Sequence, residues 1–182
     1  DYKLNDKNQF GASVNINYRL QVQLDSSKYS LQDYKLATLL DYNRDRRLPE
    51  MESDVEVNAS YQHKFNKDGH ELNVSYVSSF SKENEDNYYR NTYRFPIQPV
   101  GQDNMFYYHL NNESELSVEY SLPISEKSKF EAGYLYQHAN NNLDLKRDTL
   151  ITGTGTMKTD NQRSNQFIRR ENTHVFNHCK PI

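Results

Sequence analysis

The sequence contains a single cysteine, no long apolar run and no excess of positive charge. Cys179 has no second cysteine to pair with, which excludes a scaffold of intrachain disulfides. A transmembrane helix is excluded as well, because no run of about 18 apolar residues occurs. The net charge of -3 provides no basic footprint, so nucleic acid is not expected as a partner.

The hydrophobic content is also low for an ordinary core. A chain of 182 residues can form one domain with a substantial core, yet only 35% of its residues are hydrophobic. Disorder would explain the polarity, but 15 Tyr and 8 Phe are too many for a disordered composition. A transmembrane β-barrel explains both facts, because only alternate residues of its strands are apolar and its outer loops are polar.

The stretch "QFGASVNINYRLQVQLD" alternates strictly over residues 9–25. The even positions from Phe10 to Leu24 are apolar or aromatic, and the odd positions between them are small or polar. This pattern predicts a β-strand with one apolar face. Strands of soluble proteins usually run to about 5 or 6 residues. A tilted strand that crosses a bilayer needs about 9 to 11, so the length favours a membrane barrel.

Further alternating runs come in pairs around short polar turns. Residues 55–65 and 72–80 flank "NKDGHE", whose Asp68-Gly69 pair favours a tight hairpin turn. Residues 116–122 and 130–136 flank "PISEKSK" in the same way. The opening "NDKN" precedes the first ladder similarly, which gives a weak internal repeat of about 60 residues, each unit holding two strands.

The predicted connections fall into two classes of length. Turns near 5–8, 66–70 and 123–129 are short. Those near 25–53, 82–113 and 139–164 are long, polar and rich in Asn, Asp, Arg and Tyr. Short turns at one end and long loops at the other are typical of outer-membrane barrels, and a soluble sandwich has no reason to sort its loops this way. We expect parts of the long stretches, such as "DNYYRNTYRF", to continue the strands beyond the membrane.

Three stretches carry a resemblance to a known family. They contain a "Y-x-H-K-F" strand end before a polar turn, a "Y-S-x-P-I" strand end, "K-x-E-A-G-Y" and an "N-x-F-x-x-x-E-N" strand start. In this order and spacing the sequence resembles the barrel of TonB-dependent outer-membrane receptors. More narrowly, it resembles the outer-membrane β-barrel family of receptors with an N-terminal carboxypeptidase-like domain and plug. The stretches are "DVEVNASYQHKFNKDGHELNVSYVSSFS", "ELSVEYSLPISEKSKFEAGYLYQH" and "RSNQFIRRENTHVF".

The resemblance implies a function and a set of partners. Such receptors close about two dozen strands around a plug, and energy passed through TonB drives uptake of siderophores, cobalamin, glycans or peptides. Residues 1–182 would form a partial outer-membrane β-barrel domain of about six strands. An open set of six leaves two unpaired edges, which is untenable in lipid. We therefore expect the chain to be part of a larger barrel, and its opening on Asp1 suggests a processed chain or a fragment.

The prediction is an all-β fold of antiparallel up-and-down hairpins in the outer membrane of a Gram-negative bacterium. The expected partners are outer-membrane lipid, the remainder of the barrel with its plug domain, and the TonB complex. We expect no catalytic, cofactor or metal site; acidic residues such as Glu115 and Glu119 lie on the polar side of one strand, where water hydrates them. The residues expected to face lipid are Phe10, Ala12, Val14, Ile16, Tyr18, Leu20, Val55, Val57, Ala59, Tyr61, Leu72, Val74, Tyr76, Leu116, Val118, Tyr120, Phe130, Ala132, Tyr134 and Tyr136.

Alternatives from other classes remain open. A soluble or surface-exposed β-sandwich that binds a partner would keep the alternation but dissolve without detergent. A small closed barrel of eight strands with a structural or adhesion role would require two strands within the long connections. An outer-membrane enzyme is the least favoured reading, because the sequence offers no catalytic set.

Overall fold

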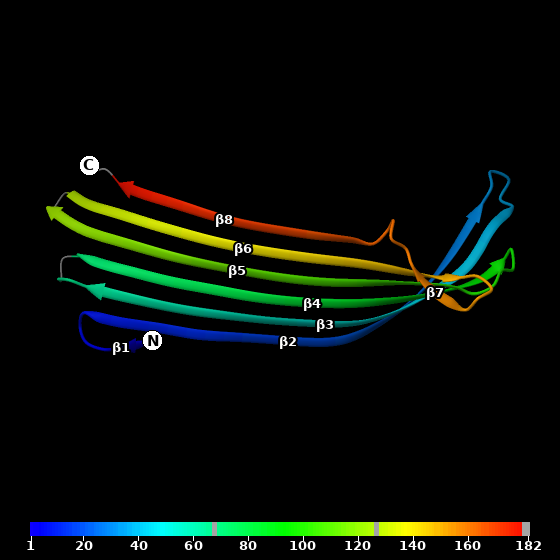
Figure 1. Ribbon diagram of the computed structural model, residues 1–182, viewed down its shortest axis with the longest axis horizontal. Coiled ribbons are helices and arrows are strands. Elements are labelled where there is room, and N and C mark those ends of the chain that lie inside the picture. Colours follow the sequence, from blue (N-terminus) through cyan, green and yellow to red (C-terminus); the bar gives the residue numbers. More distant parts are fainter. Residues whose placement is uncertain (67–68, 126–127, 180–182) are drawn as a thin grey trace.

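The structure, a computed structural model, describes residues 1–66, 69–125 and 128–179. Within them, eight strands form one antiparallel sheet, and β1 to β6 lie side by side in chain order (Figure 1). The strands are β1 Tyr2–Lys3, β2 Asn8–Gln32, β3 Thr38–Lys64, β4 Glu71–Phe95, β5 Gly101–Ser125, β6 Ser128–Ile151, β7 Thr156–Thr159 and β8 Asn165–Cys179. In the described residues, no helix is long and apolar enough to cross a membrane.

The hairpins at the end of the sheet away from the short turns, which we call the outer hairpins, have longer strands and shorter loops than the sequence suggested. The expectation of long loops near 25–53, 82–113 and 139–164 is wrong for most of these residues, because β2 to β6 extend through them. The polar residues there pair across the ladder, as Ser26 does with Asp45 and Arg90 with Gln102. Backbone hydrogen bonding between strands does not require apolar side chains, so the ladder continues where the apolar alternation stops.

The last hairpin is interrupted. β7 pairs with the outer part of β6 and β8 with the rest, so the two short strands together serve as one partner of β6. Residues 160–164 bulge out between them, and this bulge is tied to Arg147. The Arg147 carbonyl accepts a hydrogen bond from the Asp160 N–H at 2.8 Å, and its N–H donates to the Ser164 hydroxyl at 3.0 Å.

The short turns lie together at the opposite end of the sheet (Figure 1). Gly69 has a φ of 84°, the left-handed conformation that its missing Cβ permits in a tight turn. Its predicted partner Asp68 lies outside the described residues, as do 67 in the same turn and 126–127 in the predicted turn at 123–129. The turn at 5–8 joins β1 to β2, with the Leu4 N–H bonded to the Asn8 carbonyl at 3.0 Å.

Successive short turns are staggered along the sheet. The first hairpin ends at Gln9, which pairs with Gln62, and the second ends two residues further along β3, at Lys64. Glu71 then pairs with Ser121, and the third hairpin again extends further, to Pro123 paired with Lys129 and, past a register shift, to Ser125 paired with Ser128. The first two hairpins are thus offset by two residues of about 3.4 Å each, across two strand spacings of about 4.8 Å each. If the turns lie at one level, this offset corresponds to a strand tilt of roughly 35°. Closed barrels tilt their strands by about 35 to 45°.

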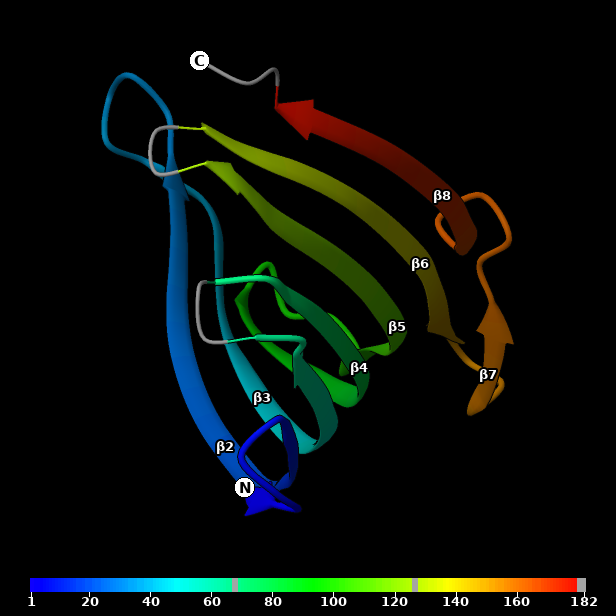
Figure 2. The same cartoon turned by 90° about the vertical axis from the view of Figure 1, so that its left-hand side faces the viewer.

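The sheet curves without closing. Viewed from the end, the long strands follow an open arc, and β2 and β8 stand apart at its two sides (Figure 2). Among the described residues, β2 has the two-residue β1 on one side and β3 on the other, and β8 pairs with β6 alone. Two long strand edges are therefore open to further pairing.

Candidate functional site

The register places all twenty residues expected to face lipid on one side of the sheet, which we call the apolar face. Cross-strand partners in an antiparallel ladder point to the same side. One row runs from Phe10 through Tyr61, Val74 and Val118 to Tyr134, and the other members occupy parallel rows of the same parity. Sequence alternation within single strands thus combines into one continuous surface.

The apolar face has two chemically distinct ends. Near the short turns it carries aromatic rings, with Phe10 against Tyr61 at a centroid distance of 4.7 Å and Phe65 stacked on His70 at 4.2 Å. Away from these turns the apolar residues continue to Leu24 on β2 but only to Phe80 on β4. We call the zone between these ends the apolar band. Beyond it the same face is mixed, with charged side chains set against aromatic rings, as Lys82 is against Tyr108.

The opposite side, the polar face, lies on the concave side of the sheet. A curved sheet crowds the side chains on its concave side, and all of the described buried residues have polar-face parity. By contrast, Ile16 on the apolar face is 74% exposed. The buried residues are Leu48, Glu50, Asn87, Asn91, Asp103 and Ser121. The concave side is therefore polar, the reverse of a soluble protein whose curved sheet encloses an apolar core.

An acidic patch occupies the polar face at the level where the apolar band ends on β4. Glu52 lies directly opposite Glu83, and Glu50 opposite Glu85, an arrangement that places like charges side by side. Arg19 offsets part of this charge, with its Nη2 at 2.6 Å from carboxylate oxygens of both Glu50 and Glu52. The patch is left with a net negative charge.

The environment of Glu83 reflects this imbalance. Glu83 lies beyond the apolar band, and its pKa is raised by burial and further by the neighbouring carboxylates of Glu85 and Glu52. His109 counteracts the rise weakly from 3.9 Å. A face with excess carboxylate charge attracts cations and basic groups. Among the described residues, however, no group of three or more His, Cys, Asp or Glu side chains is arranged to hold a metal ion.

Further out, Asp103 of β5 ties β3, β4 and β6 to its own strand across the polar face. Its Oδ2 accepts hydrogen bonds from Arg44 of β3 at 2.9 Å and from Arg147 of β6 at 3.0 Å. Asn91 donates to the other carboxylate oxygen at 3.4 Å, and Arg44 also stacks 4.0 Å from the ring centroid of Tyr89. Because Arg44 reaches over β4 to β5, the network holds the curvature of the outer sheet.

A row of tyrosine rings follows at the outer end of the polar face. Tyr29 stacks on Tyr42 with centroids 4.9 Å apart and planes 10° apart, and Tyr42 meets Tyr93 at 5.3 Å. Tyr29 is 46% exposed. Exposed aromatic faces beside the charged Asp103 network can bind compounds that combine a flat or ring-shaped body with polar groups.

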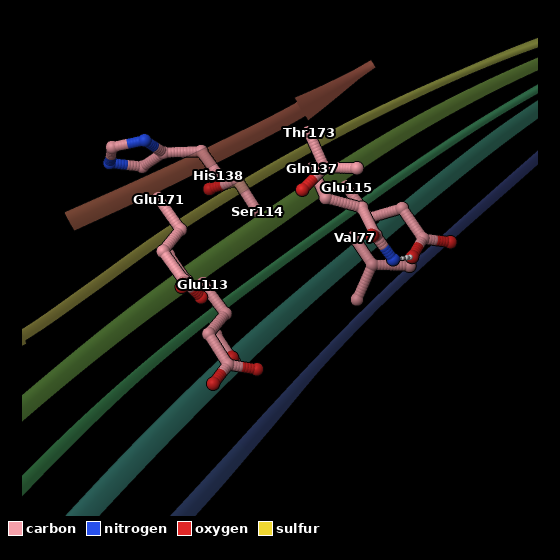
Figure 3. A pocket seen from close by; sticks show the side chains of 10 residues that line it. Val77, Glu113, Ser114, Glu115, Gln137, His138, Glu171 and Thr173 are labelled. Atoms are coloured by element: carbon pink, nitrogen blue, oxygen red, sulfur yellow. Dashed lines mark hydrogen bonds between the residues drawn. The ribbon is translucent and has the colours of Figure 1, made fainter. Parts of the chain in front are cut away.

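A hollow of about 400 Å³ lies nearer the middle of the polar face, across β4, β5, β6 and β8 (Figure 3). Glu113, Glu115 and Glu171 line it, and Gln137 donates a hydrogen bond to Glu115 at 2.8 Å. His138 points away from these carboxylates in Figure 3, because its parity is that of the apolar face. The hollow is thus an acidic recess, lined beside its carboxylates by the amide of Gln137 and the hydroxyl of Thr173.

Sequence reasoning missed the charged networks of the polar face. The alternation in "NRDRR" at 43–47 was the available signal, since it puts Arg44 and Arg46 on one side of β3. Which carboxylates these arginines meet depends on cross-strand register. Arg46 pairs with Asp25 at 2.5 Å, and Asp25 is adjacent to it only because the β2–β3 ladder continues beyond the apolar band.

Comparison with known proteins supports the reading from geometry. The outer membrane protein beta-barrel family matches residues 63–176, more than half of the chain. No curated protein shows significant similarity to the sequence. The matched segment covers the short turns near 66–70 and 123–129, the strands β4 to β7 and most of β8. The chain belongs to the outer membrane protein beta-barrel family, and its place is the outer membrane of a Gram-negative bacterium.

Proposed function

We propose that this chain forms part of the barrel wall of a TonB-dependent receptor that takes up a nutrient across the outer membrane. The observation that carries the proposal is the pair of open strand edges on a sheet whose concave side is polar. Unpaired backbone groups are not tolerated in lipid, so β2 and β8 need further strands. A polar concave face then lines a lumen wide enough for water or a plug.

The proposal assigns lipid to the apolar face. The twenty residues named above would meet acyl chains, and the aromatic rings near Phe10 and Phe65 would form the girdle at the short-turn interface. Short turns of such barrels face the periplasm, so the long outer hairpins would lie outside the cell. The other expected partners are the rest of the barrel, a plug domain and the TonB complex; we assign the wall no catalytic role.

The arc of the sheet favours a large barrel over a small one. An eight-stranded barrel is only wide enough for side chains to fill its interior. In Figure 2 the long strands β2 to β6 and β8 instead follow an open arc, with β2 and β8 apart. A wide lumen also accommodates the recess of Figure 3 and the tyrosine row as surfaces past which a solute travels.

Nutrient uptake can be tested with the full-length protein in its native host. A strain that lacks the gene and a strain that lacks TonB function should lose growth on the same nutrient in a panel of single iron, cobalamin, glycan and peptide sources. Reintroducing the gene should restore growth only when TonB is functional. Growth defects unaffected by TonB would overturn the receptor proposal, while leaving the outer-membrane location intact.

The sequence alone also allowed a soluble β-sandwich, which does not fit the family match or the polar concave face, and fractionation tests it directly. Folded barrels shift in gel mobility on heating in detergent. Recovery of the full-length protein in the outer membrane, with this shift, is expected. Recovery as a folded, β-rich protein without detergent would sink the barrel wall proposal.

A further inference from the structure

Two hollows adjoin on the apolar face of β2 to β5, where the apolar band ends. The lower one has a volume of about 400 Å³, and the upper one about 610 Å³. Val22 pairs with Pro49 and the next apolar residue, Leu24, pairs with Arg47, so the hollows are consecutive along the strands. We call them together the band-edge groove.

The groove lies at a break in the β3–β4 ladder. Pairing stops at Arg47 with Tyr88 and resumes at Glu50 with Glu85. Pro49 lies between these pairs and has no N–H to donate to β4, although it stays paired with Val22 of β2. In the described part of the chain, the Nδ2 of Asn87, which is only 1% exposed, has no hydrogen-bond partner beside this break. The sequence thus places a local opening in an otherwise regular wall.

The chemistry of the groove changes from mainly apolar to mainly charged along its length. The lower hollow is lined on this face by Leu20, Val22, Pro49 and Met51 of β2 and β3, with Asn84 and Asp86 of β4 at its edge. In the upper hollow, Arg47 and Arg90 lie with the single carboxylate of Asp45 on this face, beside Tyr88 and the amides of Gln102 and Asn104. The cationic part is further from the short turns and lies outside the apolar band.

The two arginines are available for a ligand. Elsewhere on the sheet, Arg46 and Arg94 are ion-paired with Asp25 and Asp41 at 2.5 and 2.8 Å. Among the described residues, neither Arg47 nor Arg90 takes part in an ion pair, and both are exposed. Asp45, opposite Arg90 in the ladder, instead accepts a hydrogen bond from Ser26 at 2.7 Å.

We propose that the band-edge groove binds a phosphorylated glycolipid of the outer leaflet, the lipid A part of lipopolysaccharide. A phosphate lies between Arg47 and Arg90, whose planar guanidinium groups suit bidentate contacts to phosphate oxygens. An acyl chain follows the apolar lower hollow, and Gln102 and Asn104 face the sugar hydroxyls. The inference rests on the assignment of the apolar face to lipid and goes beyond nutrient uptake, on which it does not depend.

The test uses full-length protein purified from outer membranes and delipidated in detergent. Binding of lipid A, and of lipid A stripped of its phosphates, is titrated by native mass spectrometry. Wild-type protein should bind the phosphorylated form at least about tenfold more tightly, because charge-assisted hydrogen bonds to two arginines are lost with the phosphate. Equal affinity for the two lipids would overturn the proposal without any variant.

The matched variants carry the same loss of charge. Arg47→Gln with Arg90→Gln should weaken lipid A binding at least about tenfold. Lys35→Gln with Lys158→Gln removes two exposed cations outside the groove and should leave binding unchanged. The heat-dependent gel shift verifies that both variants fold. Unchanged binding by the arginine variant would contradict the site, and nutrient uptake measured in parallel would report separately on the receptor function.

Discussion

Arginine substitutions along β2 distinguish a membrane wall from a soluble sheet. Ile16 and Leu24 lie on the same strand and the same face, and they are nearly equally exposed in this sheet, at 74% and 72%. Ile16 is near the middle of the apolar band, which runs from Phe10 to Leu24 on β2. Leu24 is eight residues further along, or about 22 Å higher at a tilt of roughly 35°.

The cost of a lipid-facing arginine depends on depth. We expect Ile16→Arg to lower the free energy of unfolding by about 2–4 kcal/mol and Leu24→Arg by about 0–1 kcal/mol. Asn17→Arg, next to Ile16 but on the polar face, should change it by no more than about 0.5 kcal/mol. Asn17 already lies near the Asp54 carboxylate, which can accept a hydrogen bond from an arginine.

The assay is equilibrium unfolding of the full-length protein in liposomes, with the folded fraction read from the heat-dependent gel shift across a urea series. Equal costs for Ile16→Arg and Leu24→Arg would refute the depth argument. A larger loss of stability for Asn17→Arg than for Ile16→Arg would mean that the polar face, and not the apolar face, meets lipid.

Three further predictions concern the polar face and the short turns, all measured as free energy of unfolding. Asp103→Asn should cost about 2–3 kcal/mol, because Arg44 and Arg147 lose their shared partner, with a partial discount for their exposure. Asp6→Asn removes a fully exposed ion pair and should leave the stability unchanged within error. Gly69→Ala should cost about 1–2 kcal/mol because its φ is positive. Glu83→Gln should stabilise the protein at pH 7 but not at pH 4. The raised pKa of Glu83 means that ionising this carboxyl costs more free energy in the folded state than in the unfolded state. The resulting loss of stability appears as the pH rises from the ordinary pKa of about 4.3 towards the pKa of the folded protein. Equal effects at both pH values would contradict that explanation.

The sequence predicted the half of the sheet near the short turns well, because apolar alternation is the signal that a lipid-facing wall produces. The strands around Val57, Val74 and Val118 could be identified, paired and oriented from period and turn chemistry alone. The outer half could not be predicted in the same way. There, residues such as Arg90 and Gln102 face water on one side and other polar groups on the other, so strand and polar loop have similar compositions.

The polar networks and the band-edge groove depend on register across several strands. The contact of Arg44 with Asp103 joins residues 59 positions apart and skips a strand. Pro49 was visible in the sequence, but its effect was not, since a proline at a strand edge and one that opens a ladder look the same without the partner strand. The short-range sequence pattern therefore predicted which residues share a face of the sheet. The polar networks and the groove on those faces became visible only in the fold.

The central claim is that lipid covers the apolar face and water the polar face of one strand. The most direct test is a series of spin labels at single cysteines through residues 72–80 of β4, in full-length protein with Cys179→Ser, reconstituted in liposomes. Oxygen, which concentrates in lipid, and a water-soluble nickel chelate would report the environment of each label. The account predicts strict alternation, with even positions accessible to oxygen and odd positions to nickel. Access of nickel to both sets, or the opposite alternation, would contradict it.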